Sequence, residues 1–108
     1  MDLKGLAADI GLDEEEVLEL VELFFETSMA ELEKLKKAMN QNDAETVVET
    51  AHSIKGAAGN MRFEEIYELA SQIEKNANEK ILDGLMANVV SIDQELQKIS
   101  TFLARITR

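Results

Sequence analysis

Residues 82–106, LDGLMANVVSIDQELQKISTFLARI, carry the most regular apolar pattern in the chain. Apolar side chains recur there at alternating spacings of three and four residues: Leu82, Leu85, Val89, Ile92, Leu96, Ile99, Leu103 and Ile106. Such spacing puts them on one helix face and is typical of a seam of coiled-coil type. Gly84 falls inside this predicted helix but off the seam, where it lowers helix stability a little. The stretch therefore predicts a long amphipathic helix that needs partner helices.

Three earlier segments predict helices of the same kind. Asp13 and Glu16 have the spacing of a capping box, so the first of these helices begins there and continues to about Met39. The apolar stripes of the three segments are Val17, Leu20, Val21, Phe24, Phe25, Leu32, Leu35 and Met39; Ala44, Val47, Ala51, Ile54 and Ala58; and Phe63, Ile66, Tyr67, Ala70, Ile73 and Ala77. Residues 2–10 predict a further short helix, with Gly11 as its C-terminal stop.

Short polar segments separate these helices. Residues 40–43 predict a loop in which Asn42 caps the next helix together with Glu45, residues 59–62 predict a tight connection, and residues 76–78 predict the next break. No segment alternates with period two for long, so no sheet is expected. Four such helices pack most simply as an antiparallel up-down four-helix bundle, with the short N-terminal helix at one end. We expect a single all-α domain over residues 1–108, with a bundle core over about residues 12–106.

Composition excludes several classes of function. The net charge of −11 disfavours nucleic acid and anionic membrane surfaces as partners, and no apolar stretch is long enough for membrane insertion. The absence of cysteine excludes thiol chemistry and fits a reducing, cytoplasmic location. No glycine loop of the kind that binds ATP or dinucleotides is present, and a single histidine without Glu-x-x-His spacing argues against a metal site. We therefore expect no cofactor and no ATP-using activity.

The single histidine, His52, is the best candidate for chemistry. It lies about 120° from the centre of the apolar stripe of its helix, at about 100° per residue, so it is expected at or beyond the edge of the buried face. Lys55 and Gly56, three and four residues further on, share its face, and Gly59 follows one turn later. A neutral imidazole can attack phosphorus, and the nearby lysine can offset the negative charge that this adds.

The segment AHSIKGAAGN, residues 51–60, resembles the signature of histidine-containing phosphotransfer (Hpt) domains. The resemblance covers about residues 12–106 and includes the arrangement of four helices. It implies that His52 accepts a phosphoryl group from a receiver-domain aspartate or donates one to it. It also implies that Lys55 compensates the phosphate charge, that Gly56 admits the partner, and that Mg²⁺ is bound by the receiver domain. The implied partners are response-regulator receiver domains and a sensor or hybrid histidine kinase.

Further positions are expected to contribute to partner docking or to orient the imidazole. Val48, Ala57 and Met61 are small or apolar residues near the site, and Gly59 leaves room for a partner. Many Hpt domains have glycine where this chain has Arg62, so the turn here is expected to differ and to bring a cation to the docking face. Glu74 or Gln72 is expected to bond the imidazole from the following helix. The alternative function is a non-catalytic helical module that binds other proteins, and phosphorylation of His52 distinguishes the two.

Overall fold

Local capping signals define the first helices of the computed structural model, which describes residues 1–106. The Asp13 carboxylate accepts a hydrogen bond from the backbone N–H of Glu16 at 2.8 Å, and the Glu16 carboxylate accepts one from the N–H of Asp13 at 3.3 Å. Gly11, at φ 84°, ends the preceding helix in the left-handed conformation that glycine adopts without strain. The helices are α1 (Leu3–Ile10), α2 (Glu14–Asn40), α3 (Ala44–Asn60), α4 (Glu64–Asn78) and α5 (Leu85–Ile106).

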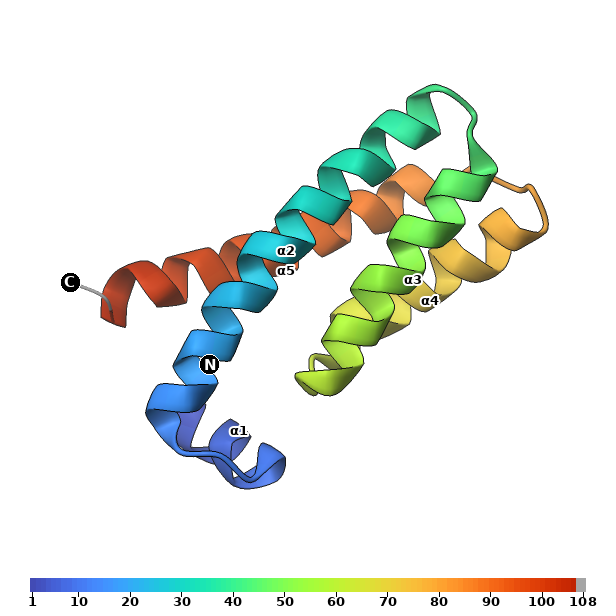
Figure 1. Ribbon diagram of the computed structural model, residues 1–108. Helices are drawn as coiled ribbons and strands as arrows, with labels where there is room; N and C mark the ends of the chain where they lie inside the picture. Colours follow the sequence, from blue (N-terminus) through green and yellow to red (C-terminus); the bar gives the residue numbers. More distant parts are fainter. Residues whose placement is uncertain (107–108) are drawn as a thin grey trace.

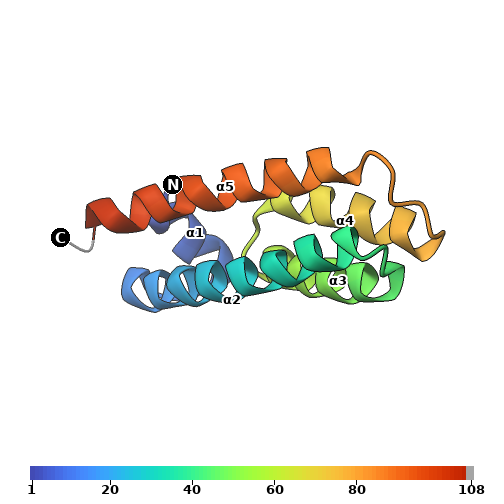
Figure 2. The same cartoon turned by 90° about the horizontal axis from the view of Figure 1, so that it is seen from above.

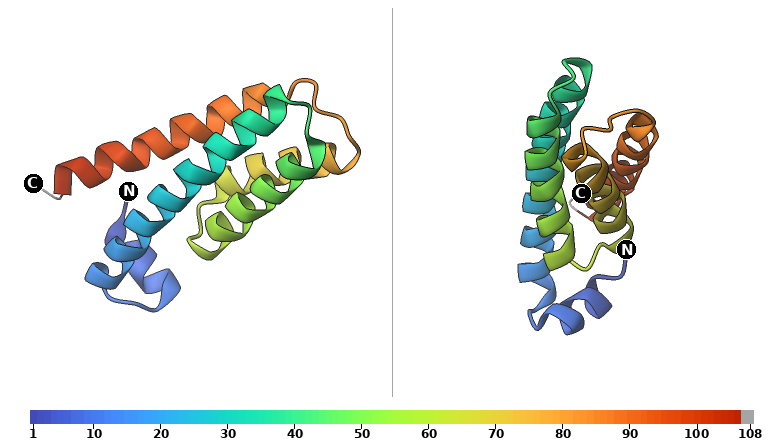
Figure 3. Two further views of the ribbon diagram at one scale, coloured as in Figure 1. Left: turned by 45° about the horizontal axis from the view of Figure 1, so that its top comes forward. Right: turned by 90° about the vertical axis from the view of Figure 1, so that its right-hand side faces the viewer.

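The helices pack side by side with short connections (Figure 1). Within the described residues α2 packs against α3 and α5, α4 packs against α3 and α5, and α1 packs against α2 alone. From α2 onward each helix runs back along the one before it, and α3 with α4 forms a shorter pair beside the longer α2 and α5 (Figure 2). The short α1 lies at the end of the molecule where α2 begins (Figure 3). The expectation of an all-α chain is confirmed, since residues 1–106 contain no strand.

The core is a continuous apolar cluster with members from all five helices. Its fully buried side chains include Leu32 and Leu35 from α2, Ile54 from α3, Ile73 from α4 and Leu96 from α5, all at the positions that helical periodicity predicts. Burial of these stripes fixes the rotation of each helix about its own axis. The core therefore decides which faces of α3 and α4 remain available for a site. No helix within residues 1–106 is long and apolar enough to cross a membrane.

Four predicted boundaries were wrong. The break predicted over residues 76–78 falls inside α4, which continues to Asn78, and Lys80 adopts φ 60° in the turn that follows. Helix α5 begins at Leu85 rather than at Leu82, and Gly84 lies in the preceding turn at φ 80°, so it does not weaken a helix interior. The cap of α3 is Asp43, which accepts from the backbone N–H of Thr46, and not Asn42, which adopts φ 53° in the turn. Helix α3 continues through Gly59 to Asn60, so the connection to α4 is confined to residues 61–63. In each case a left-handed residue one or two positions away sets the boundary.

Two predicted buried positions are also exposed. Tyr67, placed by its spacing on the apolar stripe of α4, is 39% exposed. Ile106, the last position of the predicted seam, is exposed as well. The end of α5 extends past the shorter α3 and α4, which leaves its last turn with fewer neighbours (Figure 2). At Ile106 helical spacing is therefore insufficient for burial, because α3 and α4 do not extend to the last turn of α5 (Figure 2).

Candidate functional site

The centre of the site is a contact between α3 and α4. His52 lies midway along α3 with 67% of its side chain exposed, and Glu74 of α4 lies opposite with only 15% exposed. The His52 Nδ1 atom is 2.6 Å from Glu74 Oε2. The other carboxylate oxygen, Oε1, accepts from the Nζ atom of Lys55 at 2.6 Å. One carboxylate thus holds both the imidazole and the lysine that follows it on α3.

The charge state of Glu74 determines which imidazole nitrogen is free. Partial burial would raise the pKa of the Glu74 carboxyl, but hydrogen bonds from Lys55 and His52 outweigh that effect and hold the pKa below its usual value. Glu74 is therefore ionised at neutral pH and can only accept hydrogen bonds. Nδ1 of His52 must then carry the proton, which leaves the lone pair on Nε2. Nε2 is therefore the nitrogen able to act as a nucleophile.

Lys55 supplies the positive charge of the site. The hydrogen bond to Glu74 raises the pKa of the Lys55 ammonium, and the nearby Tyr67 hydroxyl adds to the same shift. The ammonium is consequently protonated throughout the physiological range. Its side chain is 26% exposed, so the charge remains accessible to an anion that reaches His52.

Gly56 has no packing role within the described residues. A Cβ atom built at this position would find nothing within 4 Å. Glycine inside a helix costs about 1 kcal/mol relative to alanine, and here no close helix contact explains it. Gly56 lies one turn from His52 on the same face, so the open surface it leaves is immediately beside the nucleophilic nitrogen.

Gly59 and Arg62 shape the end of α3. A Cβ atom at Gly59 would lie 3.4 Å from Cδ2 and 3.5 Å from Cε2 of Tyr67, so the tyrosine ring rests against the glycine. Arg62 adopts φ 63° in the turn that follows. That conformation is one that glycine takes freely and that strains an ordinary side chain. The expectation that this turn differs from a glycine-containing turn stays a prediction.

Comparison with known families agrees with the motif. A model of the Hpt domain matches residues 19–102, which include α3, α4 and most of α2 and α5. The chain belongs to the Hpt domain family. Hpt domains carry phosphoryl groups on histidine in two-component phosphorelays, interact there with receiver domains and kinases, and do not use ATP themselves. No curated protein and no solved structure matches the chain.

The other predicted site residues of this Hpt domain differ in their exposure and in their contacts. Val48 and Ala57 are half-buried on α3, so part of each is available to a partner, whereas Met61 is 6% exposed and belongs to the core. The prediction that Met61 contributes to docking was therefore wrong. Of the two candidates for the imidazole partner, Glu74 contacts His52, while Gln72 accepts from Asn88 of α5 at 2.9 Å. Gln72 and Glu74 are two positions apart and so project from different sides of α4.

Sequence reasoning missed Tyr67 as a residue of this Hpt domain's site. Its side chain rests on Gly59, and its hydroxyl influences Lys55. The spacing held a signal, because Tyr67 precedes Glu74 by seven residues and so shares its helix face. The aromatic ring suggested a core position, and only the packing of α4 against α3 shows otherwise.

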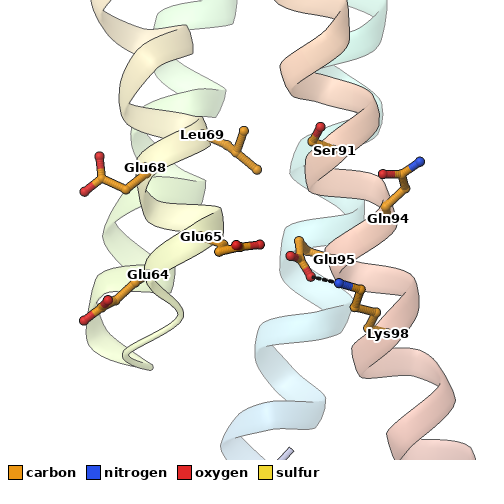
Figure 4. A pocket seen from close by; sticks show the side chains of 8 residues that line it. All are labelled: Glu64, Glu65, Glu68, Leu69, Ser91, Gln94, Glu95 and Lys98. Carbon is orange, nitrogen blue, oxygen red and sulfur yellow. Dashed lines mark ion pairs between the residues drawn. The ribbon is translucent and has the colours of Figure 1, made fainter.

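A hollow of about 530 Å³ lies between α4 and α5, and His52 is not part of its lining (Figure 4). The side chains of Glu65 and Glu95 face each other across it, and Lys98 forms an ion pair with Glu95 at 3.1 Å. The hydrogen bond to Glu95 and the negative charge of that carboxylate raise the pKa of Glu65. The acidic lining of the hollow would repel a phosphoryl group, so the hollow is not the phosphoryl-transfer site of the Hpt domain. Among residues 1–106 no group of three or more potential ligands is placed to hold a metal ion.

Proposed function

We propose that His52 is the phosphorylated residue of this chain and that it exchanges the phosphoryl group with receiver-domain aspartates. The observation that carries the proposal is the geometry of the imidazole. Glu74 holds Nδ1 at 2.6 Å, which leaves the lone pair on Nε2, and 67% of the side chain is exposed, so a partner can reach the ring. The fold that we propose for this function is an antiparallel up-down bundle of α2 to α5, with α1 as a short extra helix.

The transfer step follows from this arrangement. The Nε2 lone pair attacks the phosphorus of a receiver aspartyl phosphate, an N–P bond forms, and the P–O bond to the aspartate breaks. The aspartate leaves as a carboxylate, and the proton on Nδ1 stays in place. Because the ring gains positive charge as the new bond forms, the Glu74 carboxylate stabilises it. The reverse reaction returns the phosphoryl group by the same path, so the site suits a carrier.

Lys55 and Gly56 support the step in different ways. The phosphoryl group brings roughly two negative charges, and the Lys55 ammonium one turn away offsets part of them. Gly56 leaves the approach to Nε2 free of side chains, since nothing lies within 4 Å of its missing Cβ. Both residues act on a group delivered by a partner. Neither forms an ATP site.

The partners that we propose are response-regulator receiver domains and a sensor or hybrid histidine kinase. Mg²⁺ would be held by the receiver domain, so we assign no cofactor to this chain. Val48, Ala57, Gly59 and Arg62 are proposed to join the docking surface. A carrier that exchanges phosphoryl groups with such partners works in the cytoplasm, and we propose that location.

The test is phosphorylation of purified chain by receiver domains loaded with acetyl phosphate and Mg²⁺. The parent is expected to gain an acid-labile, base-stable phosphoryl group, and His52→Gln is expected to gain none. His52 is exposed, so the variant should keep the helical circular dichroism and unfolding midpoint of the parent. Undiminished labelling of a folded His52→Gln variant would refute the assignment. Binding of receiver domains without labelling of the parent would favour the non-catalytic module instead.

A further inference from the structure

Along α3, the two sides of His52 differ in how many side chains cover the surface. Towards the start of the helix, Val48 and Glu49 carry side chains at and next to the site face. Towards its end, Gly56 and Gly59 follow at four and seven residues, and neither has a side chain. A partner that must bring its phosphorus to Nε2 therefore meets least obstruction on the side of the α3–α4 turn.

A hollow of about 260 Å³ lies at the end of α3 that carries Gly56 and Gly59. Ala58 and Gly59 from α3, Phe63 from the turn and Tyr67 from α4 provide its apolar lining, and Arg62 and Glu64 add one cation and one anion to it. Phe63 packs edge-to-face against Phe24 of α2, with ring centroids 4.9 Å apart. The volume is below the roughly 300–1,000 Å³ of sites for small molecules, so a single side chain of a protein partner is the better match.

The hollow falls within the area that a docked receiver must cover. Gly59 is seven residues from His52, which is about 10 Å along the helix axis at about 1.5 Å per residue. Even a transient interface of about 600 Å² per partner corresponds to a disc of roughly 14 Å radius. A receiver domain centred on His52 and displaced towards the glycines therefore reaches Tyr67.

Tyr67 and Arg62 have the properties of interface anchors. Tyr67 is 39% exposed although the Cδ2–Cε2 edge of its ring lies beside Gly59, so part of the ring is accessible to a partner. Arg62 is exposed and occupies φ 63°, a conformation that strains an ordinary side chain but not glycine. Tyrosine and arginine are enriched among the residues that dominate binding energy at protein interfaces.

We propose that Tyr67 and Arg62 are specificity residues of this chain, which select among receiver domains by binding an apolar side chain and a carboxylate next to it. The proposal rests on the proposed function, because it assumes that a receiver domain docks at His52. The apolar side chain enters the hollow against Tyr67, and the carboxylate pairs with Arg62. Among the described residues that line the hollow, Arg62 is the one cation, so it is the group there that can pair with a carboxylate of the partner.

The experiment measures phosphotransfer from a panel of purified receiver domains, each loaded with acetyl phosphate and Mg²⁺, to the full chain. The variants are Tyr67→Ala, Tyr67→Phe and Arg62→Gly. Lys80→Gly is the matched control, because Lys80 is also an exposed cation at a left-handed position, φ 60°, but lies in the α4–α5 turn. Thermal unfolding of every variant shows that it is folded. The half-life of the phosphohistidine is measured in parallel.

Tyr67→Ala is expected to lower kcat/KM about tenfold with the best receiver, which corresponds to about 1.4 kcal/mol. The loss should arise in KM, should differ between receivers, and should leave the phosphohistidine half-life unchanged. Tyr67→Phe should keep most of the activity, because it keeps the ring. Arg62→Gly should lower kcat/KM severalfold without loss of stability, since glycine relieves the strain, and Lys80→Gly should match the parent.

Other outcomes overturn the proposal in recognisable ways. Equal effects on every receiver, or the same effect from Arg62→Gly and Lys80→Gly, would show that this end of the site does not select partners. A shortened half-life with an unchanged KM would show that Tyr67 acts through Lys55 instead. Normal phosphorylation of His52 in all variants would overturn this inference alone. A parent that no receiver phosphorylates would overturn the proposed function, and this inference with it.

Discussion

Substitution of Gly56 separates access to the site from stability of the fold. Gly56 lies inside α3, and apart from its own stretch of helix a Cβ atom there would meet nothing described within 4 Å. Gly56→Ala should therefore gain the full difference in helix propensity, about 0.8–1.0 kcal/mol. At about 2.1 cal/mol/K per residue, the unfolding entropy of a chain of this length is roughly 0.23 kcal/mol/K, so Tm should rise by about 4 °C. Gly56→Gln should gain nearly as much, because glutamine is also a good helix former.

Phosphotransfer should respond in the opposite direction. The new side chain projects beside His52 into the space through which the receiver approaches, and glutamine extends much further than alanine. We expect kcat/KM to fall about tenfold or more in Gly56→Gln, the equivalent of about 1.4 kcal/mol, and severalfold or less in Gly56→Ala. Urea unfolding and phosphotransfer from a loaded receiver domain, measured on the same preparations, test both halves.

The two variants control for each other, since both stabilise the helix and only their size differs. A Gly56→Gln variant that is more stable than the parent and transfers at the parental rate would refute the access argument. A loss of stability in Gly56→Ala would instead show that the glycine has a packing role. That result would contradict the open space around its missing Cβ.

Lys55→Ala should shorten the phosphohistidine half-life severalfold, because the ammonium offsets the phosphate charge, and it should lower the unfolding midpoint only slightly, through loss of the ion pair with Glu74; a large drop in midpoint with normal transfer would contradict this. Glu74→Gln should slow phosphorylation of His52 by about tenfold, and it should change the acid stability of the chain. Since the pKa of Glu74 is lowered in the folded chain, its contacts stabilise the fold above the ordinary value of 4.5 and are lost as the pH falls through the lower folded-state pKa. The parent should therefore lose more stability than Glu74→Gln as the pH falls below 4.5, and parallel urea titrations would reveal equal losses if the reasoning is wrong. Gly84→Ala should destabilise the chain by about 1–2 kcal/mol, because φ 80° disfavours any side chain, and an unchanged urea midpoint would contradict the turn geometry.

The sequence determined those features that depend on residues close together in the chain. Helical spacing placed the main core positions, and the Asp13–Glu16 capping box marked the start of α2. The exposure of His52 was also predictable, because its angle from the apolar stripe of α3 follows from about 100° per residue. The motif around His52 resembled the Hpt signature, and the match over residues 19–102 confirms the family.

Tertiary structure alone decided how α3 and α4 meet. Gln72 and Glu74 were equal candidates by sequence, since both are polar and both lie on the predicted helix after the motif. Burial of Ala70, Ile73 and Ala77 fixes the rotation of α4, and that rotation turns Glu74 towards His52 while Gln72 reaches Asn88. Tyr67 became a site residue for the same reason, because the rotation that presents Glu74 also brings its ring onto Gly59. A local pattern specifies which face of a helix is apolar, but the identity of the neighbour across that face depends on how the helices pack together.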